Sequence, residues 1–342
     1  MFFSRDELVI TPTRTLKPLS QTAENISVVT AEDIENMNAH TLSEVLDLVA
    51  GVFVDFQGHD FIGASTAFIQ GSDARHVLFL LDGVTLNTLG SGETTISTVP
   101  VGIIKRIEII KGPASSVWGS ALGGVINIVT KDPGATQRPE GIVSASYGKN
   151  SSQDYRADVS GTAGKAGYYI YAGRTGTDGL KNNRDSENNI FYAKLHIPLS
   201  KDSGLKVTAG YNEPFNDYGL PGYSVTTGDY RSFFTTASFS SGISNELNFE
   251  ADIAALDTGL ITRTEKADGT YFREFDNRER KYTGSARLIY SHDMHTAVIG
   301  LDAADGRLEQ RVETPAVIET APESTKWAIF ANDTISLGRL AI

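Results

Sequence analysis

The sequence predicts two parts of different fold class: a small mixed α/β domain, followed by antiparallel strands of the kind that build a transmembrane β-barrel. Three observations support this division. Before Pro133 and Gly134, short apolar strand patterns alternate with helix-capping signals. After them no convincing amphipathic helix appears, and segments of alternating apolar and polar residues continue to the end of the chain. Tyrosines gather near the ends of these segments, as in the aromatic girdle of a membrane barrel.

Composition limits the cellular compartments and the partners that we expect for this chain. The chain has 342 residues, enough for one large or two ordinary domains, and a net charge of -12 without a basic tract, so nucleic acid is not an expected partner. Cysteine is absent, which removes disulfide and thiolate–metal sites and suits an oxidising compartment. No run approaches ~18 consecutive apolar residues, which excludes a transmembrane helix but not membrane-spanning strands. The start, MFFSRDE, lacks the apolar region of a signal peptide, so we expect either a lost signal peptide or a misplaced start.

The N-terminal segment contains a β-favouring pentad, ELVIT, at residues 7–11. Pro12 and Pro18, with basic residues between them, follow the pentad. This composition predicts an extended, unpaired strand. A frayed N-terminal arm is the alternative interpretation.

Residues 26–56 predict a strand, two short helices and a second strand. ISVVT is the first strand, and Thr30 caps a helix through Asp33. Thr41 caps the second helix, and Gly51 ends it before the strand VFVDF. The apolar face of the second helix has helical spacing and consists of Leu42, Val45, Leu46 and Val49.

Two polar, glycine-containing loops follow, at residues 57–66 and 88–98. In the first loop His59 stands beside Asp60, which favours a solvated pair and leaves a metal ligand as the alternative. Between the loops, the apolar run 77–84 predicts a strand that closes in an Asp-Gly turn.

The stretch 101–131, VGIIKRIEIIKGPASSVWGSALGGVINIVTK, predicts a strand, a compact turn and a second strand. The strands are 104–110 and 125–129. A phosphate-binding loop would need Lys and Ser/Thr at the start of a helix after the glycines, but here the glycines lead into strand residues. They therefore predict tight turns and close backbone approach.

This stretch resembles the end of the plug domain of TonB-dependent outer-membrane receptors, whose pattern is roughly I-E-R-I-E-V-x-x-G-P, then Y-G, then G-G-V-I-N-I-x-T-K. The chain reads IKRIEIIKGP, WG and GGVINIVTK, a long match at consistent spacing. It has Ala50 where the family has proline, and Gln70 where the family has an arginine thought to seat the plug against barrel carboxylates. Arg75 lies nearby, but that role does not transfer to it. The plug signature in this chain consists of Gly71, Asp82, Gly83, Glu108, Gly112, Pro113, Gly119, Gly123, Gly124 and Asn127.

The resemblance implies three segments: a TonB-box segment and linker at 1–19, a plug domain at 20–133, and the N-terminal part of a barrel at 134–342. In the TonB box, backbone groups would complete a sheet edge in the periplasmic partner TonB. Its residues would be Glu7, Leu8, Val9, Ile10 and Thr11. The plug apices facing an extracellular ligand would be Gly63, Ala64, Ser65 and Thr66 in one loop, and Leu89, Gly90, Ser91, Gly92, Glu93 and Thr94 in the other.

The second part predicts about ten strands, with short turns on one rim and long loops on the other. The short connections include 163–165 and 201–203, and the long ones 213–229 and 258–271. A soluble β-sandwich or solenoid is the alternative. The predicted strands are 142–147, 155–161, 168–175, 191–199, 205–211, 233–239, 247–255, 282–290, 296–301 and 327–335.

Barrel size indicates that these strands are part of a larger barrel. Ten strands would close to a barrel about 20 Å across, whereas a compact domain of about 130 residues is roughly 36 Å wide. A barrel of about 22 strands, roughly 44 Å across, would hold that domain. We therefore expect a truncated chain that carries the complete plug and a little under half of the barrel. Such a chain leaves an unpaired strand edge, which favours aggregation.

Other chemistry has weaker support. His292 and His295 are three positions apart, so on one strand they face opposite sides, which disfavours a shared metal. Candidates for calcium-binding loops are Asp302 with Asp305 and Asp217 with Asp229, without EF-hand spacing. Ser115, Ser116 and Ser120 lack histidine and acidic partners at a recognisable spacing for nucleophilic catalysis. We expect no cofactor, no resident metal and no enzymatic activity.

The resemblance implies a receptor for TonB-dependent active uptake in the outer membrane of a Gram-negative cell. Its partners would be TonB with the inner-membrane energising complex, outer-membrane lipid and a scarce ligand. We expect a ferric siderophore or another iron chelate, with cobalamin as the alternative within the family. From other classes, an outer-membrane barrel enzyme such as a phospholipase and a soluble periplasmic binding or adhesion module remain alternatives.

Overall fold

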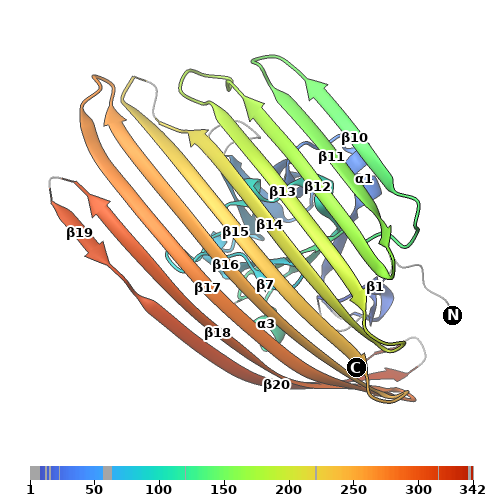
Figure 1. Ribbon diagram of the computed structural model, residues 1–342. Coiled ribbons are helices and arrows are strands. Elements are labelled where there is room, and N and C mark those ends of the chain that lie inside the picture. Colours follow the sequence, from blue (N-terminus) through green and yellow to red (C-terminus); the bar gives the residue numbers. More distant parts are fainter. Residues whose placement is uncertain are drawn as a thin grey trace.

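The computed structural model describes residues 8–11, 14, 17–22, 24–56, 64–119, 121–219, 222–314, 316–337 and 340–341. The chain forms a small α/β domain, here called the inner domain (24–130), and a large antiparallel sheet, here called the curved sheet (140–341). In Figure 1 the inner domain lies behind the curved sheet, on its concave side. Both predicted parts are therefore present, in the predicted order.

The inner domain is built on a five-stranded sheet with the order β3-β8-β9-β6-β7. Only the β6–β9 pair is parallel. β6 and β9 are almost continuously apolar because both faces of the sheet are covered there, and every residue of β6 is buried. The strand bounds are β3 Ile26–Thr30, β6 Val77–Leu81, β7 Val84–Thr85, β8 Ile104–Lys111 and β9 Gly124–Thr130.

Two short helices, α1 (Ala31–Asn36) and α2 (Leu42–Asp47), cover this sheet, and both begin with the predicted caps. Thr30 forms a capping box with Asp33, and Thr41 forms one with Glu44, so orphan N–H groups at each helix start are satisfied. The second helix ends at Asp47, two residues before Val49, the last residue of its predicted apolar face. Its apolar face still packs into the core.

Two pairs of strands stand outside the central sheet. β4 (Val52–Phe56) and β5 (Ser65–Ile69) form a hairpin. β1 (Leu8–Val9) pairs antiparallel with β2 (Lys17–Pro18), so the prediction of an unpaired N-terminal strand is wrong for these residues. The error arose because the partner strand is too short to show a pattern. The remaining short elements are η2 Leu19–Gln21, η3 Ala74–His76, η4 Ile96–Thr98, η5 Val101–Ile103 and α3 Ser115–Trp118.

The curved sheet contains every strand predicted for the second part, joined to its sequence neighbours in antiparallel order. β19 and β20 both pair with β18, one after the other, so they act as one interrupted strand. The bounds are β10 Glu140–Tyr147, β11 Gln153–Ala163, β12 Ala166–Thr177, β13 Ser186–Pro198, β14 Ser203–Asp217, β15 Ser224–Gly242, β16 Leu247–Lys266, β17 Tyr271–His292, β18 His295–Glu313, β19 Val317–Thr320, β20 Glu323–Leu337 and β21 Leu340–Ala341.

The long loops predicted at 213–229 and 258–271 are mostly strand. β14 continues to Asp217, β15 begins at Ser224 and β16 continues to Lys266. In these extensions polar residues occupy both faces, so the alternation that reveals a half-buried strand is missing. The connections that remain are only a few residues long.

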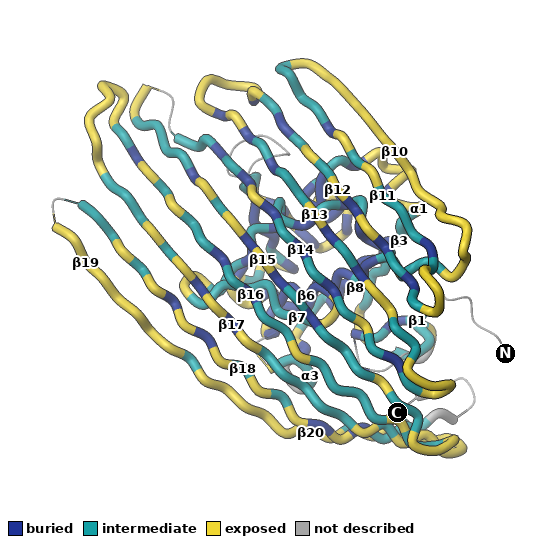
Figure 2. Tube along the Cα trace, viewed as in Figure 1, coloured by how far each residue is buried: buried dark blue, intermediate teal, exposed yellow. Residues whose placement is uncertain are grey.

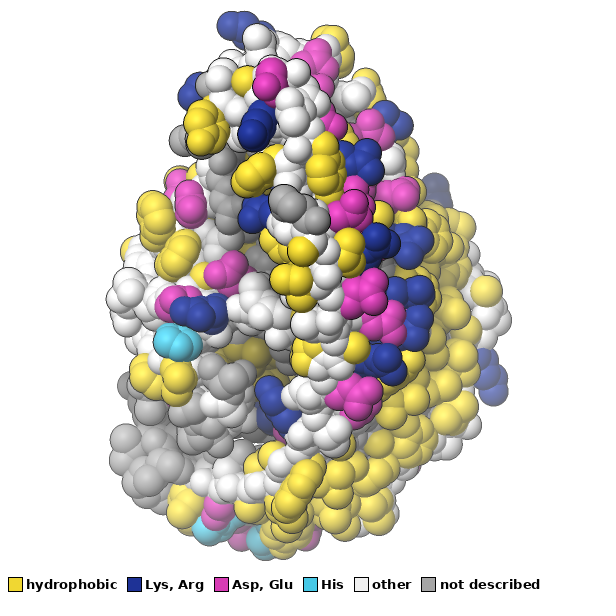
Figure 3. All heavy atoms as spheres, turned by 90° about the vertical axis from the view of Figure 1, so that its left-hand side faces the viewer, with side chains coloured by type: hydrophobic (Ala, Val, Ile, Leu, Met, Phe, Trp, Pro, Cys, Tyr) yellow, Lys and Arg dark blue, Asp and Glu magenta, His cyan; other side chains and the backbone are white. Residues whose placement is uncertain are grey.

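The two faces of the curved sheet differ in chemistry. Along β13, Tyr192 and Lys194 are buried toward the inner domain, whereas Phe191 and Leu195 are exposed on the outer face. Figure 2 shows this alternation of buried and exposed positions along the strands. The outer face, on the right in Figure 3, is covered by hydrophobic side chains. They include Ile170, Phe191, Leu195, Phe233, Ile253, Tyr282, Leu288, Ile299 and Leu301.

No helix within the described residues has the length and apolar character needed to span a membrane.

The main hydrophobic core joins the two parts. Inward-facing Tyr171, Phe234 and Leu256 of the curved sheet belong to the same buried cluster as Val99 and Ile103 of the inner domain. Because one continuous core covers both surfaces, the inner domain is packed against β12–β16.

Candidate functional site

The predicted TonB-box segment is docked on the inner domain through Thr11, which is fully buried. A single carboxylate oxygen, Glu108 Oε2, accepts hydrogen bonds from the Ile10 N–H (2.9 Å), the Thr11 N–H (2.9 Å) and the Thr11 hydroxyl (2.6 Å). Glu108 is itself fully buried, and Arg106 Nε donates to its other oxygen at 2.8 Å. The charge on Glu108 is therefore compensated where it holds the segment.

Two further side chains complete the Thr11 site. Asn127 Nδ2 donates to the Thr11 hydroxyl at 3.0 Å, and Trp118 Nε1 donates to the Thr11 carbonyl at 2.7 Å. Val9 is also fully buried. The structure thus brings together part of the predicted TonB box with Glu108 and Asn127 of the plug signature. Glu7, the first residue of the predicted box, lies outside the described residues.

Arg14 ties the same segment to the curved sheet. Its Nη1 contacts Asp302 Oδ2 at 2.6 Å, and its Nη2 donates to the Val117 carbonyl at 2.6 Å. The guanidinium lies 4.4 Å from the ring centroids of both Trp118 and Phe330. An arginine held by a carboxylate and two aromatic faces is a strongly favoured arrangement.

The second predicted apex, 89–94, is a loop closed at its base by Asn87. The Asn87 side chain accepts from the Phe79 N–H (2.8 Å) and donates to the carbonyls of Val77 and Gly92 (2.8 Å each). Gly90 and Ser91 are exposed at the tip. Leu89, Gly92 and Glu93 are half-buried, and Thr94 is buried.

An ion pair of the curved sheet forms hydrogen bonds with the backbone of this apex loop. Glu279 Oε2 accepts from the Leu89 N–H at 2.7 Å, and Lys281 Nζ donates to the Asn87 carbonyl at 2.5 Å. The two charges lie 3.6 Å apart and are both buried. The wall of the sheet therefore positions the loop through charged groups that carry hydrogen bonds to its backbone.

The described residues of the first predicted apex, 64–66, are not exposed. Ser65 and Thr66 belong to β5 and are buried, and the Ser65 hydroxyl forms a hydrogen bond with the Ser43 hydroxyl of α2. The polar sequence suggested a loop, but these hydroxyls are satisfied inside the domain. Ala64 is half-buried, and Gly63, His59 and Asp60 lie outside the described residues.

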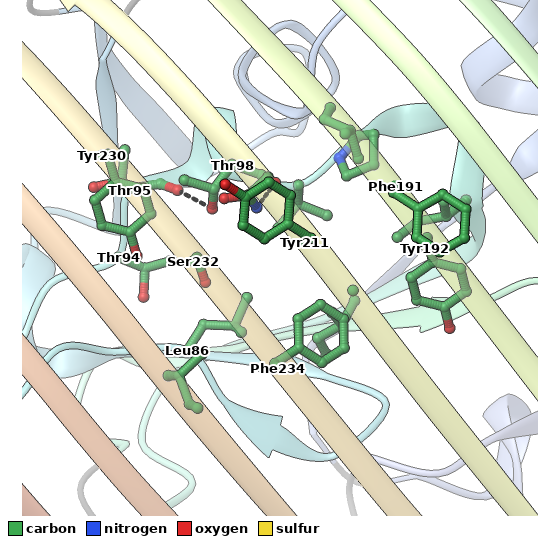
Figure 4. Close-up of a pocket in the computed structure, with 18 of the residues that line it drawn as sticks. Leu86, Thr94, Thr95, Thr98, Phe191, Tyr192, Tyr211, Tyr230, Ser232 and Phe234 are labelled. Carbon is green, nitrogen blue, oxygen red and sulfur yellow. Dashed lines mark hydrogen bonds between the residues drawn. The ribbon is translucent and has the colours of Figure 1, made fainter.

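A cavity of about 580 Å³, including its open mouth, separates the apex segment 86–100 from the inward face of the curved sheet. Figure 4 shows Leu86, Thr94, Tyr192, Tyr230 and Phe234 arranged around it. Among the described residues that line it, none is Asp, Glu, Lys, Arg or His. The cavity therefore suits an uncharged group that is part aromatic or aliphatic and part hydroxyl or amide.

Two buried polar atoms near this cavity lack a partner within the described residues: the Thr94 hydroxyl and Asn212 Oδ1. Asn212 uses its Nδ2 to donate to the Thr98 carbonyl at 2.7 Å, which leaves its acceptor oxygen free. Unsatisfied buried polar groups cost free energy, so they favour a ligand or water that supplies the missing hydrogen bonds.

Asp82 of the plug signature sits in the predicted Asp-Gly turn, with φ of 48° at Asp82 and 87° at Gly83. Its two oxygens accept from the Thr130 N–H (2.9 Å) and hydroxyl (2.6 Å), and Oδ2 lies 2.8 Å from Lys194 Nζ on β13. Burial by itself raises the pKa of the Asp82 carboxyl, but the Lys194 ammonium and the Thr130 hydrogen bonds outweigh it and hold that pKa below its ordinary value.

His40 makes a further contact between the two parts. Its Nδ1 lies 2.7 Å from Asp154 Oδ2 on β11, and Arg156 both pairs with Asp154 and donates to the His40 carbonyl at 3.2 Å. The hydrogen bond to Asp154 raises the pKa of His40 above its ordinary value, although burial opposes the shift. Neither residue was singled out from the sequence, since the contact joins positions 114 residues apart.

Gln70 lies on the surface, whereas two of the signature glycines lie at crowded positions. Gln70 is exposed, and nearby Arg75 pairs with Asp73 at 2.9 Å on the surface. Gly124 has φ of 153°, and a Cβ there would lie 2.4 Å from the Ile110 carbonyl oxygen. A Cβ at Gly123 would lie 2.3 Å from the Ser72 hydroxyl. These two glycines therefore allow the close backbone approach that the sequence predicted.

The residues that were weaker candidates for metal binding lie on strands of the curved sheet. His292 and His295 face each other as cross-strand partners on β17 and β18, so placing them on one strand was wrong. Each instead contacts a carboxylate, Glu246 at 2.7 Å and Asp333 at 2.8 Å respectively. The aspartates proposed for calcium loops, Asp217, Asp229, Asp302 and Asp305, all lie in strands. Within the described ranges, no cluster of three or more His, Asp or Glu side chains has a metal-binding arrangement.

Residues 18–125 match the family of the TonB-dependent receptor plug domain. The chain also has the fold of solved receptors at low sequence identity. BauA, the ferric preacinetobactin receptor from Acinetobacter baumannii, is 15% identical, with a TM-score of 0.79 over 97% of this chain and 58% of that chain. The pyoverdine outer-membrane receptor FpvA from Pseudomonas aeruginosa PAO1 is 14% identical, with a TM-score of 0.82 over 96% and 56%.

The copper transporter OprC is 15% identical, with a TM-score of 0.74 over 92% of this chain and 52% of that chain. This chain therefore spans between 52% and 58% of the length of these three structures. At such identities the likeness shows a shared fold.

Proposed function

We propose that this chain, a TonB-dependent outer-membrane receptor by its plug domain and its fold, belongs to a protein that takes up a scarce ligand by TonB-dependent active transport. It binds and passes the ligand without making or breaking bonds in it.

One observation carries the proposal. The inner domain lies on the concave side of the curved sheet, and its apex segment and the inward strands enclose a cavity with unsatisfied polar atoms. On the opposite face the sheet exposes hydrophobic side chains suited to lipid. A domain that fills a membrane barrel and offers a binding cavity at one end is suited to gated passage of one ligand.

The ligand is proposed to be an iron chelate. Two of the matched structures are named as a ferric preacinetobactin receptor and a pyoverdine receptor, which supports this class. A third is named as a copper transporter, so the shared fold accommodates different metals. The uncharged lining of the cavity would receive an aromatic or amide portion of the chelate. Cobalamin is the second candidate, favoured by the same lack of charged lining residues.

Coupling to TonB is proposed to use the segment around Val9. Leu8 and Val9 are paired with Lys17 and Pro18, and Thr11 is held by Glu108. Their backbone groups become available to complete a sheet edge in TonB only after these contacts open. Docking of the segment would therefore keep the unloaded receptor from engaging TonB.

The experiment expresses the complete gene, locates its product by membrane fractionation and measures capture by the C-terminal domain of TonB. Val9→Pro removes the N–H needed for strand addition, while Val9→Ala keeps it and serves as the matched control. Both variants loosen the docked segment, so release alone would increase capture in both. Outer-membrane location, with capture lost only in Val9→Pro, supports the proposal. A soluble product or capture indifferent to Val9→Pro would support a soluble binding module instead.

Ligand class is tested by growth. A strain lacking its other receptors, and carrying this one, is grown on ferric siderophores or on cobalamin as the limiting nutrient. Growth on an iron chelate that requires both TonB and this receptor supports the primary proposal, and growth on cobalamin alone supports the second candidate.

A further inference from the structure

We propose that the buried contact of Asp82 and Thr130 with Lys194 and Tyr192 is a latch that retains the inner domain in the barrel and must open for ligand to pass. The first two residues belong to the inner domain and the last two to β13 of the curved sheet. The name latch refers below to these four residues.

The latch is compact, and three of its four residues are buried, whereas the Asp82 side chain is 23% exposed. Lys194 is only 2% exposed, and its ammonium lies 2.8 Å from Asp82 Oδ2 and also contacts the Thr130 hydroxyl. The Tyr192 hydroxyl lies 2.8 Å from the Thr130 hydroxyl. Because Thr130 donates its hydroxyl proton to Asp82, the Tyr192 hydroxyl is the donor in that second contact.

The position of the latch explains why it would retain the domain. Asp82 follows the end of β6 and Thr130 ends β9, the two parallel strands at the centre of the inner sheet. Asp82 also joins the backbones of the two strands there, since its N–H donates to the Ile128 carbonyl of β9 at 2.9 Å. A pull on the inner domain therefore reaches this corner through both strands, and the corner is attached to the curved sheet by a charge pair whose cation, Lys194, is buried. Opening this pair leaves the buried Lys194 ammonium without its counter-charge, which is costly.

The signs of the two charges are reversed relative to the contact that the resemblance implies, in which the plug supplies the cation and the barrel supplies the carboxylates. A cation on the inner domain would have been arginine at position 70, where this chain has an exposed Gln70. Here the inner domain supplies the anion, Asp82, and the barrel strand supplies the cation, Lys194.

The latch also borders the cavity. Tyr192 lines the cavity with its ring and reaches Thr130 with its hydroxyl, while Leu81, the neighbour of Asp82, lines the cavity from the other side. A group that enters the cavity would therefore press on the ring whose hydroxyl completes the latch.

The test is a double-mutant cycle on the complete receptor, read by hydrogen exchange of backbone amides in detergent. Asp82→Asn keeps the oxygen that accepts from the Thr130 N–H but removes the charge, and Lys194→Met keeps the length of the side chain. Each single variant is expected to speed exchange in β6, β7 and β9 by about 100-fold, which equals about 2.7 kcal/mol at 1.36 kcal/mol per tenfold. The double variant is expected to be no faster than the worse single variant, because the pair is already lost.

Tyr192→Phe is expected to have a smaller effect, since it removes one hydrogen bond and keeps the ring. Exchange at the end of β9 should rise about threefold to tenfold. Arg174→Met is the matched control, because Arg174 forms an exposed ion pair with Glu187 between the neighbouring strands β12 and β13. Additive effects of Asp82→Asn and Lys194→Met, or equal acceleration in β15 and β16, would overturn the latch.

Retention is read separately in cells. A receptor with an opened latch should admit vancomycin, which an intact outer membrane excludes, so Lys194→Met cells should be at least fourfold more sensitive than Arg174→Met cells. Unchanged sensitivity together with faster exchange would mean that the contact stabilises the inner domain without retaining it, and would overturn the proposal. The role in passage rests on the proposed transport function, but neither readout needs ligand or TonB, so the two proposals fail separately.

Discussion

Thr11 and Glu108 are 97 residues apart in the chain, yet one oxygen of Glu108 accepts hydrogen bonds from both the N–H and the hydroxyl of Thr11. The segment proposed to engage TonB is therefore fastened at its end by a buried carboxylate. Its release requires that carboxylate to lose at least two donors.

Thr11→Val is expected to loosen this docking. The substitution preserves shape but removes the hydroxyl that contacts Glu108 and Asn127, at a cost of about 1–3 kcal/mol. Since less free energy is then needed to release the segment, the apparent affinity for the C-terminal domain of TonB should rise about tenfold. Titration calorimetry measures it. Thr85→Val in β7 is the control, and equal affinity of Thr11→Val and the wild type would refute a restraining role for Thr11.

The contact between His40 and Asp154 is expected to strengthen at low pH. The pKa of His40 is raised in the folded protein, so its stabilising contribution is complete below the ordinary pKa of about 6.5 and is lost as pH rises through the raised value. Two other charged groups also face the ring: Arg156 lowers the pKa of His40 and Glu44 raises it. Protection factors of the α1 and α2 amides, which correct for the intrinsic pH dependence of hydrogen exchange, should therefore be higher at pH 5.5 than at pH 8.5.

His40→Gln keeps a hydrogen-bonding side chain but does not titrate. The pH dependence of the protection factors in α1 and α2 should disappear in this variant. If it persists unchanged, another group controls the contact.

Arg14→Lys is expected to release the N-terminal segment even though the charge is kept. Lysine cannot donate to Asp302 and the Val117 carbonyl while lying flat between the rings of Trp118 and Phe330. A loss of about 1–2 kcal/mol should make proteolysis near Arg14 about five to thirty times faster. Lys17→Arg, a conservative change in the same segment, is the control. Cleavage at the wild-type rate would show that the charge alone is sufficient.

Gly124→Ala is expected to destabilise the inner domain by about 3 kcal/mol or more. The new Cβ would lie 2.4 Å from the Ile110 carbonyl oxygen, and φ of 153° is a conformation that L residues rarely adopt. Urea unfolding followed by Trp118 fluorescence reports on the domain. Gly148→Ala, whose Cβ would find its nearest neighbour at 3.7 Å, should change stability by less than about 1 kcal/mol.

Local features of this protein could be predicted from its sequence because their partners are adjacent. The capping boxes of Thr30 and Thr41 span three residues, and the Asp82-Gly83 turn is complete in two. Apolar alternation located the central parts of the barrel strands. It missed their polar ends and the burial of Ser65 and Thr66, because burial of a hydroxyl depends on a partner from another element.

The contacts between the two parts could not be read in this way. Arg14 meets Asp302, and His40 meets Asp154, across 288 and 114 residues respectively. A single lysine on a strand, such as Lys194, has no pattern that distinguishes an inward ion-pair partner from a solvated surface charge. Only the register of the curved sheet reveals which charges face the inner domain.

The polar extensions make the strands of the curved sheet longer than a membrane requires. β17 has 22 residues, and at about 3.3 Å per residue with a tilt near 40° it rises roughly 55 Å. The hydrocarbon layer accounts for about 30 Å of that height. Roughly 25 Å of the strand height therefore projects beyond the hydrocarbon layer. Large molecules such as antibodies and phage tail proteins would meet this projecting part first. A small molecule, in contrast, would pass along the inward face of these strands, which restrict its escape sideways.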